Sequence, residues 1–377
     1  MPLTVFNSRE TLKAAVDDCS ADLHVNVALL GVGGVGRALV DALLGARTHH
    51  REVYGLRFDL RVVADSSGYL AGEIDDARLK SAADAKSGGR KLATLAGAVE
   101  GDASQAIAAL GEGALVVDVT ASDATTSLLI DALKRGQKVV SANKKPFSSE
   151  QASYDALVGH PVRHNNVRHE STVGAGLPAI AALNRLSMAN DKVRKIAGTF
   201  SGTLGYVMSG LEAGRPFSEV VLEAKTKGYT EPDPRDDLGG VDVARKALIL
   251  ARGLGWRLEL SDVNVEPLYP PAMASLSVDE FLAKLPSLDA DFSRRATEAK
   301  ARGEALRYAA TVENGRLDVG LVSVSTASPL GSLSGTDNLV EYYTTWYDPS
   351  PLVVRGAGAG AGATAAGALA DMVELSV

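Results

Sequence analysis

The sequence has few of the features that would indicate an oxidising compartment, a membrane or a nucleic-acid partner. It contains one cysteine, Cys19, so no disulfide forms within the chain, and a reducing compartment such as the cytoplasm is expected. It has no run of about 18 strongly apolar residues, which argues against a transmembrane helix. The formal net charge is −7, whereas nucleic-acid binding needs a basic face. Near the start, Arg9 and Lys13 interrupt the apolar core that a secretory signal requires.

The composition is that of a globular protein with a substantial core. Apolar residues make up 46% of the chain and charged residues 23%. A length of 377 residues exceeds one typical domain, so we expect two.

The first clear motif is a glycine loop between a strand and a helix. Residues 24–44, HVNVALLGVGGVGRALVDALL, begin with alternating apolar residues and continue with apolar residues at helical spacing. The loop fits the pattern G-x-G-x-x-G and consists of Gly31, Val32, Gly33, Gly34, Val35 and Gly36. Such glycines let a backbone approach a pyrophosphate, and the helix N-terminus supplies free N–H groups. We predict a dinucleotide site here; the alternative is a tight turn without a ligand.

An acid at the end of the next strand, 59–65, is the second sign of a dinucleotide site. Asp65 stands where a carboxylate accepts a hydrogen bond from the ribose 2′-OH, at a longer spacing from Gly36 than the usual about 20 residues. In that role it would favour NAD over NADP. The alternative is an ordinary strand-end aspartate, and the nearby cations Arg57 and Arg90 keep NADP open.

Strands and helices alternate through the first 150 residues, which predicts an α/β fold with a parallel sheet. A strand is predicted at 114–120, a helix at 127–136, and a strand that leads into a loop at 137–146. The pattern then changes to that of a mixed α+β domain. There we predict helices at 170–186 (after a glycine turn), 217–229, 241–255, 279–285 and 293–306, strand and small-residue loop at 195–211, a hairpin turning at Asn314–Gly315, and finally a strand, a glycine loop and a closing helix.

The most unusual stretch is 228–246, GYTEPDPRDDLGGVDVARK, in which prolines and glycines separate many charged residues. It does not match the calcium-loop pattern D-x-[DN]-x-[DN]-G. Asp242 and Lys246 lie four residues apart at the start of a predicted helix. They are either a surface ion pair or a lysine held in a cleft by its carboxylate. Lys144, at the end of the predicted strand 137–146, is either a loop cation or a ligand contact.

Several separated motifs together resemble homoserine dehydrogenase, most closely the short monofunctional fungal and plant-like form. These are GVGGVG, SANKKPFSS, HESTVGAGLP, FSGTLGY, GYTEPDPRDDLGGVDVARK and GAGAGA, and the resemblance covers residues 24–372. It implies a Rossmann domain over 1–150, completed by 341–377, and a mixed α+β catalytic and dimerisation domain over 151–340. The implied reaction interconverts L-aspartate 4-semialdehyde and L-homoserine with NAD or NADP, in the pathway to threonine, methionine and isoleucine. A homodimer is implied as well.

The resemblance also implies a role for particular residues. Lys246 would be the proton donor, Asp242 would orient the substrate, and Lys144 would lie between cofactor and substrate. The remaining implied contacts are Gly228, Glu231 and Asp237 for substrate, Thr120 and Gly360 for cofactor, and Glu170, Val173, Ala175 and Leu177 for Na⁺. Two alternatives stay open: a Rossmann-type reductase of another amino-acid aldehyde, and a non-catalytic NAD(P) sensor.

Overall fold

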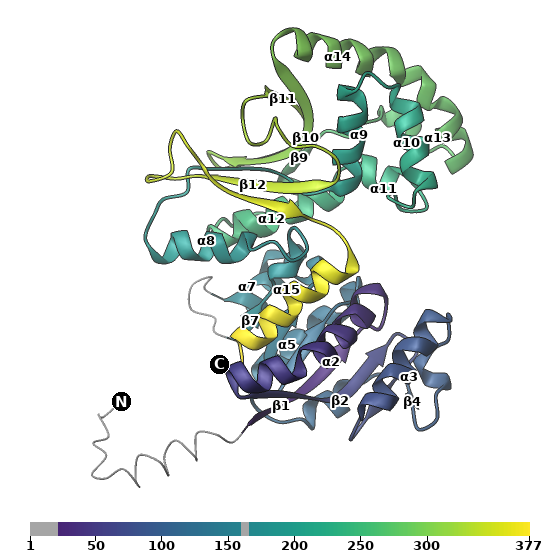
Figure 1. Ribbon diagram of the computed structural model, residues 1–377, viewed down its shortest axis with the longest axis vertical. Helices are drawn as coiled ribbons and strands as arrows, with labels where there is room; N and C mark the ends of the chain where they lie inside the picture. The colour runs from purple at the N-terminus through teal and green to yellow at the C-terminus, as the bar shows by residue number, and fades with distance from the viewer. Residues whose placement is uncertain (1–21, 160–165) are drawn as a thin grey trace.

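The computed structural model describes residues 22–159 and 166–377, and the chain forms two units that are each built on one sheet (Figure 1). Cys19 lies outside these residues. Among the helices of the described residues, none is both long enough and apolar enough to cross a membrane.

The first sheet has seven strands. In spatial order the strands are β4(Val99–Glu100), β3(Gly68–Ala71), β2(Leu56–Asp65), β1(Leu23–Leu30), β5(Leu115–Asp118), β6(Lys138–Ser141) and β7(Val167–Arg168). The five from β2 to β7 in this spatial order are parallel, as predicted. Strand β3 is antiparallel to β2, and the edge strand β4 is antiparallel to β3. All four residues of β5 are buried, as expected for a parallel strand covered on both faces.

Helices cover both faces of this sheet because alternate residues of its strands point to opposite sides. Val27 and Leu29 of β1 belong to the core under α2(Gly34–Tyr54) and α15(Ala361–Glu374), whereas Ala28 and Leu30 belong to the core under α5(Thr126–Lys134) and α7(Gln151–Val158). The remaining helices of this unit are α3(Asp76–Ser87), α4(Ser104–Ala108) and α6(Lys144–Phe147). The C-terminal α15 therefore packs beside α2, near the opposite end of the sequence (Figure 1).

The second sheet has six strands, in the order β13(Leu352–Ala357), β12(Asp337–Tyr343), β8(Lys195–Thr199), β10(Glu304–Glu313), β11(Arg316–Ser325) and β9(Val263–Val265). The predicted hairpin is confirmed, and Asn314 and Gly315 both have positive φ, 52° and 77°, as a type I′ turn requires. The helices of this unit are α8(Ala179–Met188), α9(Gly202–Glu212), α10(Phe217–Thr226), α11(Arg235–Leu238), α12(Val241–Gly253), α13(Val278–Lys284) and α14(Asp289–Ala301).

One element prediction was wrong. The glycine-rich residues after strand β8 were expected to be a loop, but they form helix α9. The side chain of Ser201 caps this helix by accepting a hydrogen bond from the N–H of Leu204, 3.2 Å away. Burial of Leu204, Val207 and Leu211 outweighs the low helix propensity of the glycines.

The sheets suggest domain boundaries that differ from 150 and 341. Strand β7 belongs to the first sheet, and β12 and β13 belong to the second. We therefore propose a first unit that ends near residue 168 and regains only the chain from about residue 358 onward.

Candidate active site

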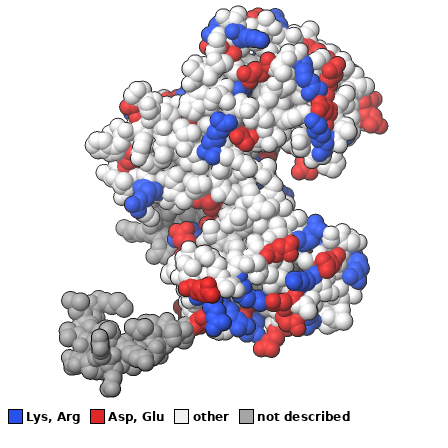
Figure 2. Space-filling model, in the orientation of Figure 1, with Lys and Arg blue, Asp and Glu red and all other residues white. Residues whose placement is uncertain are grey.

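A cavity of about 1080 Å³ lies at the carboxyl ends of the parallel strands, where open α/β sheets bind their ligands. Both units contribute to its walls, and the molecule is hollowed between them on the face shown in Figure 2. Its lining includes Gly31, Val32, Gly33, Gly34, Val35, Asp65, Ser66, Lys86, Thr120, Ser122, Thr125, Lys144, Lys246, Gly358 and Ala359. Most of the predicted cofactor residues are in this list, whereas Gly36 and Gly360 are not.

The glycine loop has the geometry that a pyrophosphate requires. Gly31 adopts φ 97°, which only glycine adopts readily. A Cβ on Gly36 would collide with the carbonyl oxygen of Gly31, so this glycine closes the turn instead of touching a ligand. A Cβ on Gly33 would meet no atom within 4 Å, so its backbone faces open space at the start of α2. The residues present therefore fit a dinucleotide at this end of the cavity.

Asp65 does not present a free carboxylate to the cavity. Its Oδ1 accepts hydrogen bonds from the N–H and hydroxyl of Ser67 and from the N–H of Gly68, at 2.6–3.2 Å. Its Oδ2 accepts from Lys86 Nζ at 2.7 Å and from the N–H of Leu92 at 3.2 Å. Burial raises the pKa of Asp65, but these hydrogen bonds outweigh it and lower the pKa to about 2. Protein donors thus saturate the carboxylate. Lys86 also lines the cavity beside Asp65, and its ammonium has N–H donors left for a ligand.

Sequence reasoning missed a buried carboxylate behind two residues that line the cavity, Thr120 and Thr125. Asp118, at the end of β5, is 0% exposed. Its Oδ1 accepts from the N–H and hydroxyl of Thr120 at 2.9 and 2.7 Å, and its Oδ2 accepts from Thr125 Oγ1 at 2.7 Å and Asn143 Nδ2 at 3.0 Å. Its position two residues before the predicted cofactor contact Thr120 was the only signal in the sequence.

Lys144, Asp242 and Lys246 form one cluster at the far end of the cavity. Asp242 Oδ1 lies 2.8 Å from Lys144 Nζ, and Oδ2 lies 2.8 Å from Lys246 Nζ. Lys246 Nζ also donates to the carbonyl oxygen of Phe200 at 2.5 Å, and its side chain is only 12% exposed. Burial raises the pKa of Asp242, but the two lysines hold it well below its ordinary value. The cluster joins α6 of the first unit to α12 of the second.

Helix α12 is placed by a glycine that no other residue replaces easily. Gly240 precedes the helix with φ 73°, and a Cβ there would collide with the hydroxyl of Tyr308. That hydroxyl donates to the carbonyl of Glu266 at 2.9 Å, so it is not free to move. Asp242 therefore lies in the first turn of α12, where the helix dipole favours a negative charge.

The predicted substrate residues lie between α10 and α12, outside the lining of the cavity: Gly228 and Glu231 in the loop after α10, and Asp237 in α11. Gly228 follows α10 with φ 71°. The N–H of Glu231 donates to Asp237 Oδ2 at 2.8 Å. Burial raises the pKa of Asp237, with smaller contributions from Glu231 and Asp242. The structure thus brings Asp237 near the lysine cluster and holds Glu231 against it.

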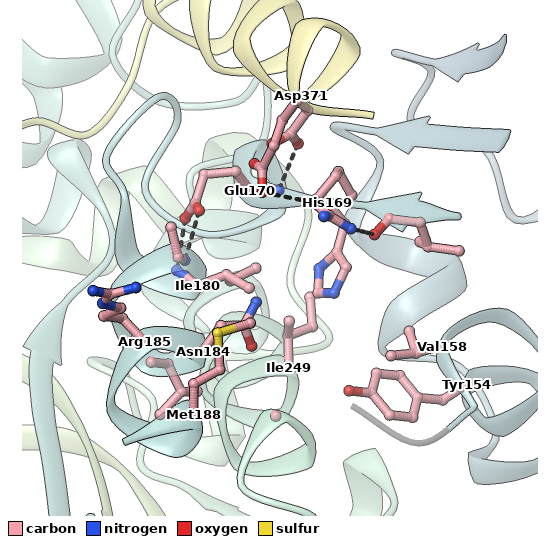
Figure 3. Close-up of a pocket in the computed structure, with 16 residues that line it drawn as sticks. Tyr154, Val158, His169, Glu170, Ile180, Asn184, Arg185, Met188, Ile249 and Asp371 are labelled. Carbon is pink, nitrogen blue, oxygen red and sulfur yellow. Dashed lines mark hydrogen bonds and ion pairs between the residues drawn. The ribbon is translucent and has the colours of Figure 1, made fainter. Parts of the chain in front are cut away.

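The predicted sodium loop lies beside a second cavity of about 270 Å³ (Figure 3). The carboxylate of Glu170 accepts hydrogen bonds from the N–H groups of Ile180 and Ala181 at 2.6 and 2.7 Å, and so caps α8. Burial raises the pKa of Glu170 to about 7. The N–H of Glu170 donates to Asp371 of α15, as Figure 3 shows. Each carboxylate oxygen of Glu170 keeps a lone pair beyond these hydrogen bonds, so its role as a cation ligand stays a prediction.

The backbone of the same loop offers better cation ligands than its side chain. Among the described residues, no N–H or O–H donates to the carbonyl oxygens of Val173 or Ala175, although both residues are buried. The Leu177 carbonyl accepts from the N–H of Ala179 at 2.7 Å. Ala175 has φ 57°, a strained value for a residue with a side chain. Clusters of three or more His, Cys, Asp or Glu suited to a metal are not found in the described part of the chain.

Comparison with known proteins agrees with the two units. A family model described as homoserine dehydrogenase, NAD binding domain, matches residues 31–168, and one described as homoserine dehydrogenase matches residues 178–373. The chain is 35% identical to homoserine dehydrogenase of Saccharomyces cerevisiae over 93% of its own length and 98% of that protein. A solved structure of a protein of unknown function from Candida auris superimposes with a TM-score of 0.82 at 34% identity, covering 93% of this chain and 98% of that one.

A longer relative matches only in part. The chain is 44% identical to bifunctional aspartokinase/homoserine dehydrogenase 2 of Zea mays over 70% of its own length, but the match spans 29% of that protein. The matches to both family models and to nearly the whole yeast protein lead to one conclusion. This chain belongs to the homoserine dehydrogenase family.

Proposed function

We propose that the protein interconverts L-homoserine and L-aspartate 4-semialdehyde with a nicotinamide cofactor. The observation that carries this proposal is the Lys144–Asp242–Lys246 cluster at the end of a dinucleotide-shaped cavity. Reduction of an aldehyde needs an acid at the carbonyl oxygen, and a lysine beside a fixed carboxylate supplies one. When bound, the reduced nicotinamide supplies the hydride.

Lys246 is the residue best suited to the proton transfer. An ammonium carries three N–H donors, and two of them meet fixed acceptors, Asp242 and the Phe200 carbonyl. The third is available to a substrate oxygen in the cavity that Lys246 lines. After this proton leaves, the neutral amine keeps both hydrogen bonds, so its orientation is the same in both directions of the reaction.

The substrate is an amino acid, and the surrounding charges match its two ionic groups. We assign the ammonium of the substrate to the acidic side of the cluster. This side is formed by Asp242, Asp237 and the loop from Gly228 to Glu231. We assign Lys144 to hold the substrate beside the cofactor, because it is 33% exposed and Asp242 is its one ion-pair partner among the described residues. Two of its N–H donors are therefore available.

We propose that the cofactor site accepts NADP. Asp65 would normally repel a 2′-phosphate, but its charge is paired with Lys86 and its oxygens are saturated. Lys86 and the exposed hydroxyl of Ser66 face the cavity at this point and are suitable donors to a phosphate.

We also propose a sodium ion held by the carbonyl oxygens of Val173, Ala175 and Leu177. Oxygen-only ligands suit a hard cation, and two of these carbonyls have no donor among the described residues. Glu170 then acts by fixing the loop against α8. Thermal unfolding in sodium chloride and in choline chloride at equal ionic strength tests this: a midpoint that is the same in both salts contradicts it.

A homodimer is the proposed assembly. Strand β13 is an edge of the second sheet, and an exposed edge with apolar side chains readily pairs with another chain. Next to it, Trp346 is 78% exposed, although buried Asp191 accepts hydrogen bonds from the N–H groups of Thr345 and Trp346 and so holds the loop rigidly. Trp346→Glu should shift the mass measured by light scattering from dimer to monomer. An unchanged dimer, or a wild-type monomer, contradicts this assignment.

Turnover tests the proposed reaction. Purified protein is incubated with NADP⁺ or NAD⁺ and with L-homoserine, L-threonine or L-serine, and absorbance at 340 nm is followed at alkaline pH. We expect oxidation of L-homoserine with a kcat/KM at least about 10² above the other two, because an alcohol of the wrong length or with a bulky β-carbon misplaces the hydroxyl relative to Lys246. Turnover of another alcohol instead indicates a different aldehyde reductase. Cofactor binding without any turnover indicates a sensor.

A further inference from the structure

Asp118 has features that a purely structural aspartate does not need. It is completely buried, and no Lys, Arg or His of the described residues lies within ion-pair distance of its carboxylate. Each of its two oxygens accepts a hydrogen bond from an N–H group, one from Thr120 and one from Asn143. A buried charge without a cation is costly, so it is retained where something else uses it.

The hydrogen-bond partners of Asp118 link it to the walls of the cavity. Thr120 and Thr125 both line the cavity and both donate to this carboxylate. Asn143 donates to it from the end of β6 and also accepts from the N–H of Lys145, so it caps the short helix that begins at Lys144. Asp118 thereby holds the ends of β5 and β6 together and fixes the backbone from which Lys144 projects.

The position of Asp118 corresponds to the nicotinamide half of a bound cofactor. The glycine loop and the end of β2, with Asp65 and Lys86, form the half that receives the pyrophosphate and the adenosine ribose. The opposite half of the cavity is lined by Thr120, Lys144 and Lys246. A nicotinamide bound in that half would lie near the carboxyl ends of β5 and β6, where Thr120 and Lys144 line the cavity.

Asp118 adds a buried negative charge close to this half of the cavity. Lys144 and Lys246 contribute two positive charges, and Asp242, which is paired with both, contributes one negative charge. The remaining positive charge would oppose an oxidised nicotinamide, which is itself a cation. Asp118 supplies a negative charge from a fully buried position, where solvent does not screen it.

We propose that Asp118 is a positioning residue of the nicotinamide subsite that favours the oxidised ring by its buried charge. This inference rests on the proposed cofactor cavity and adds a specific residue to it. Asp118→Asn keeps the shape of the side chain and removes its charge. The new amide NH₂ is a donor and faces groups that also donate. A unit charge acting over about 10 Å at an effective dielectric constant of about 20 alters an affinity roughly tenfold.

Binding measurements by calorimetry, without substrate, test the proposal. The probes are NADP⁺, NADPH and 2′-phospho-ADP-ribose, which lacks the nicotinamide, and their NAD counterparts in parallel. In Asp118→Asn we expect the Kd of the oxidised cofactor to rise about ten times more than that of the reduced cofactor, while the Kd of the ribose fragment stays within twofold of wild type. The matched control is Asp123→Asn, which removes the same charge from a 70% exposed side chain paired with Lys145; it should leave all three affinities within twofold.

Other outcomes overturn the inference. Equal weakening of all three probes indicates that Asp118 only stabilises the fold, and an unchanged ratio of oxidised to reduced affinity removes its electrostatic role. If Asp118→Asn does not fold, Thr125→Val removes one donor to the same carboxylate. It should weaken both cofactors a few-fold and leave the ribose fragment unaffected; wild-type affinities for all three would contradict the positioning role. Wild-type protein that binds none of the probes overturns the proposed function together with this inference.

Discussion

Replacing Lys246 by methionine separates its chemical role from its structural one. Methionine keeps an unbranched apolar stem in a site that is only 12% exposed, and it removes all three N–H donors. Loss of a general acid lowers kcat by about 10²–10⁴, which corresponds to roughly 3–5 kcal/mol of barrier. The structural cost is smaller, about 1–3 kcal/mol, because the Phe200 carbonyl and Asp242 Oδ2 each lose a donor but Asp242 keeps Lys144 as its ion-pair partner.

The assay follows absorbance at 340 nm with L-homoserine and oxidised cofactor between about pH 7 and 10, alongside the unfolding midpoint of the same preparations. We expect kcat of Lys246→Met to fall about 10³-fold while the midpoint falls by only a few degrees. Lys134→Met is the control, because this exposed lysine also pairs with a nearby carboxylate, Asp131 at 3.0 Å, far from the cavity. A variant whose kcat stays within tenfold of wild type refutes the assignment and makes Lys144 the next candidate.

Three further predictions concern the cofactor site and the entry to α12. Lys86→Met should raise the Kd of 2′,5′-ADP about tenfold by calorimetry and change that of 5′-ADP less than twofold, whereas Lys80→Met, exposed on the same helix, should change neither. Gly240→Ala should lower the free energy of unfolding by about 2–3 kcal/mol in urea, and Gly255→Ala, with similar φ but open space around it, by only about 1 kcal/mol. Because the folded-state pKa of Asp65 is lowered from 3.8 to about 2, its stabilisation is present above about pH 4 and is lost as the pH falls toward 2. Asp65→Asn should therefore cost about 2 kcal/mol at pH 7 and much less at pH 2; a constant difference contradicts this reasoning.

Features that depend on neighbouring residues could be predicted from the sequence. The glycine loop, the parallel strands, the Asn314–Gly315 hairpin and the start of α12 each follow from local periodicity or from a backbone angle that few residues adopt. The placement of Asp242 and Lys246 on one face of a helix is of the same kind, because a spacing of four residues determines it. The family resemblance extended these local observations to the reaction.

The tertiary structure decided what each charged group does, because the partner of a side chain is set by packing and lies far along the chain. Asp65 stands where a ribose carboxylate is expected, yet Lys86 and Leu92 occupy it. Helix α9 forms in spite of its glycines, because the burial of its apolar face outweighs local propensity. The Lys144–Asp242 pair and the network around Asp118 join the ends of strands and helices that no local pattern brings together. Sequence alone thus determined the elements and the residue types available for chemistry, whereas the fold determined which of those charges are paired, buried or free to meet a ligand.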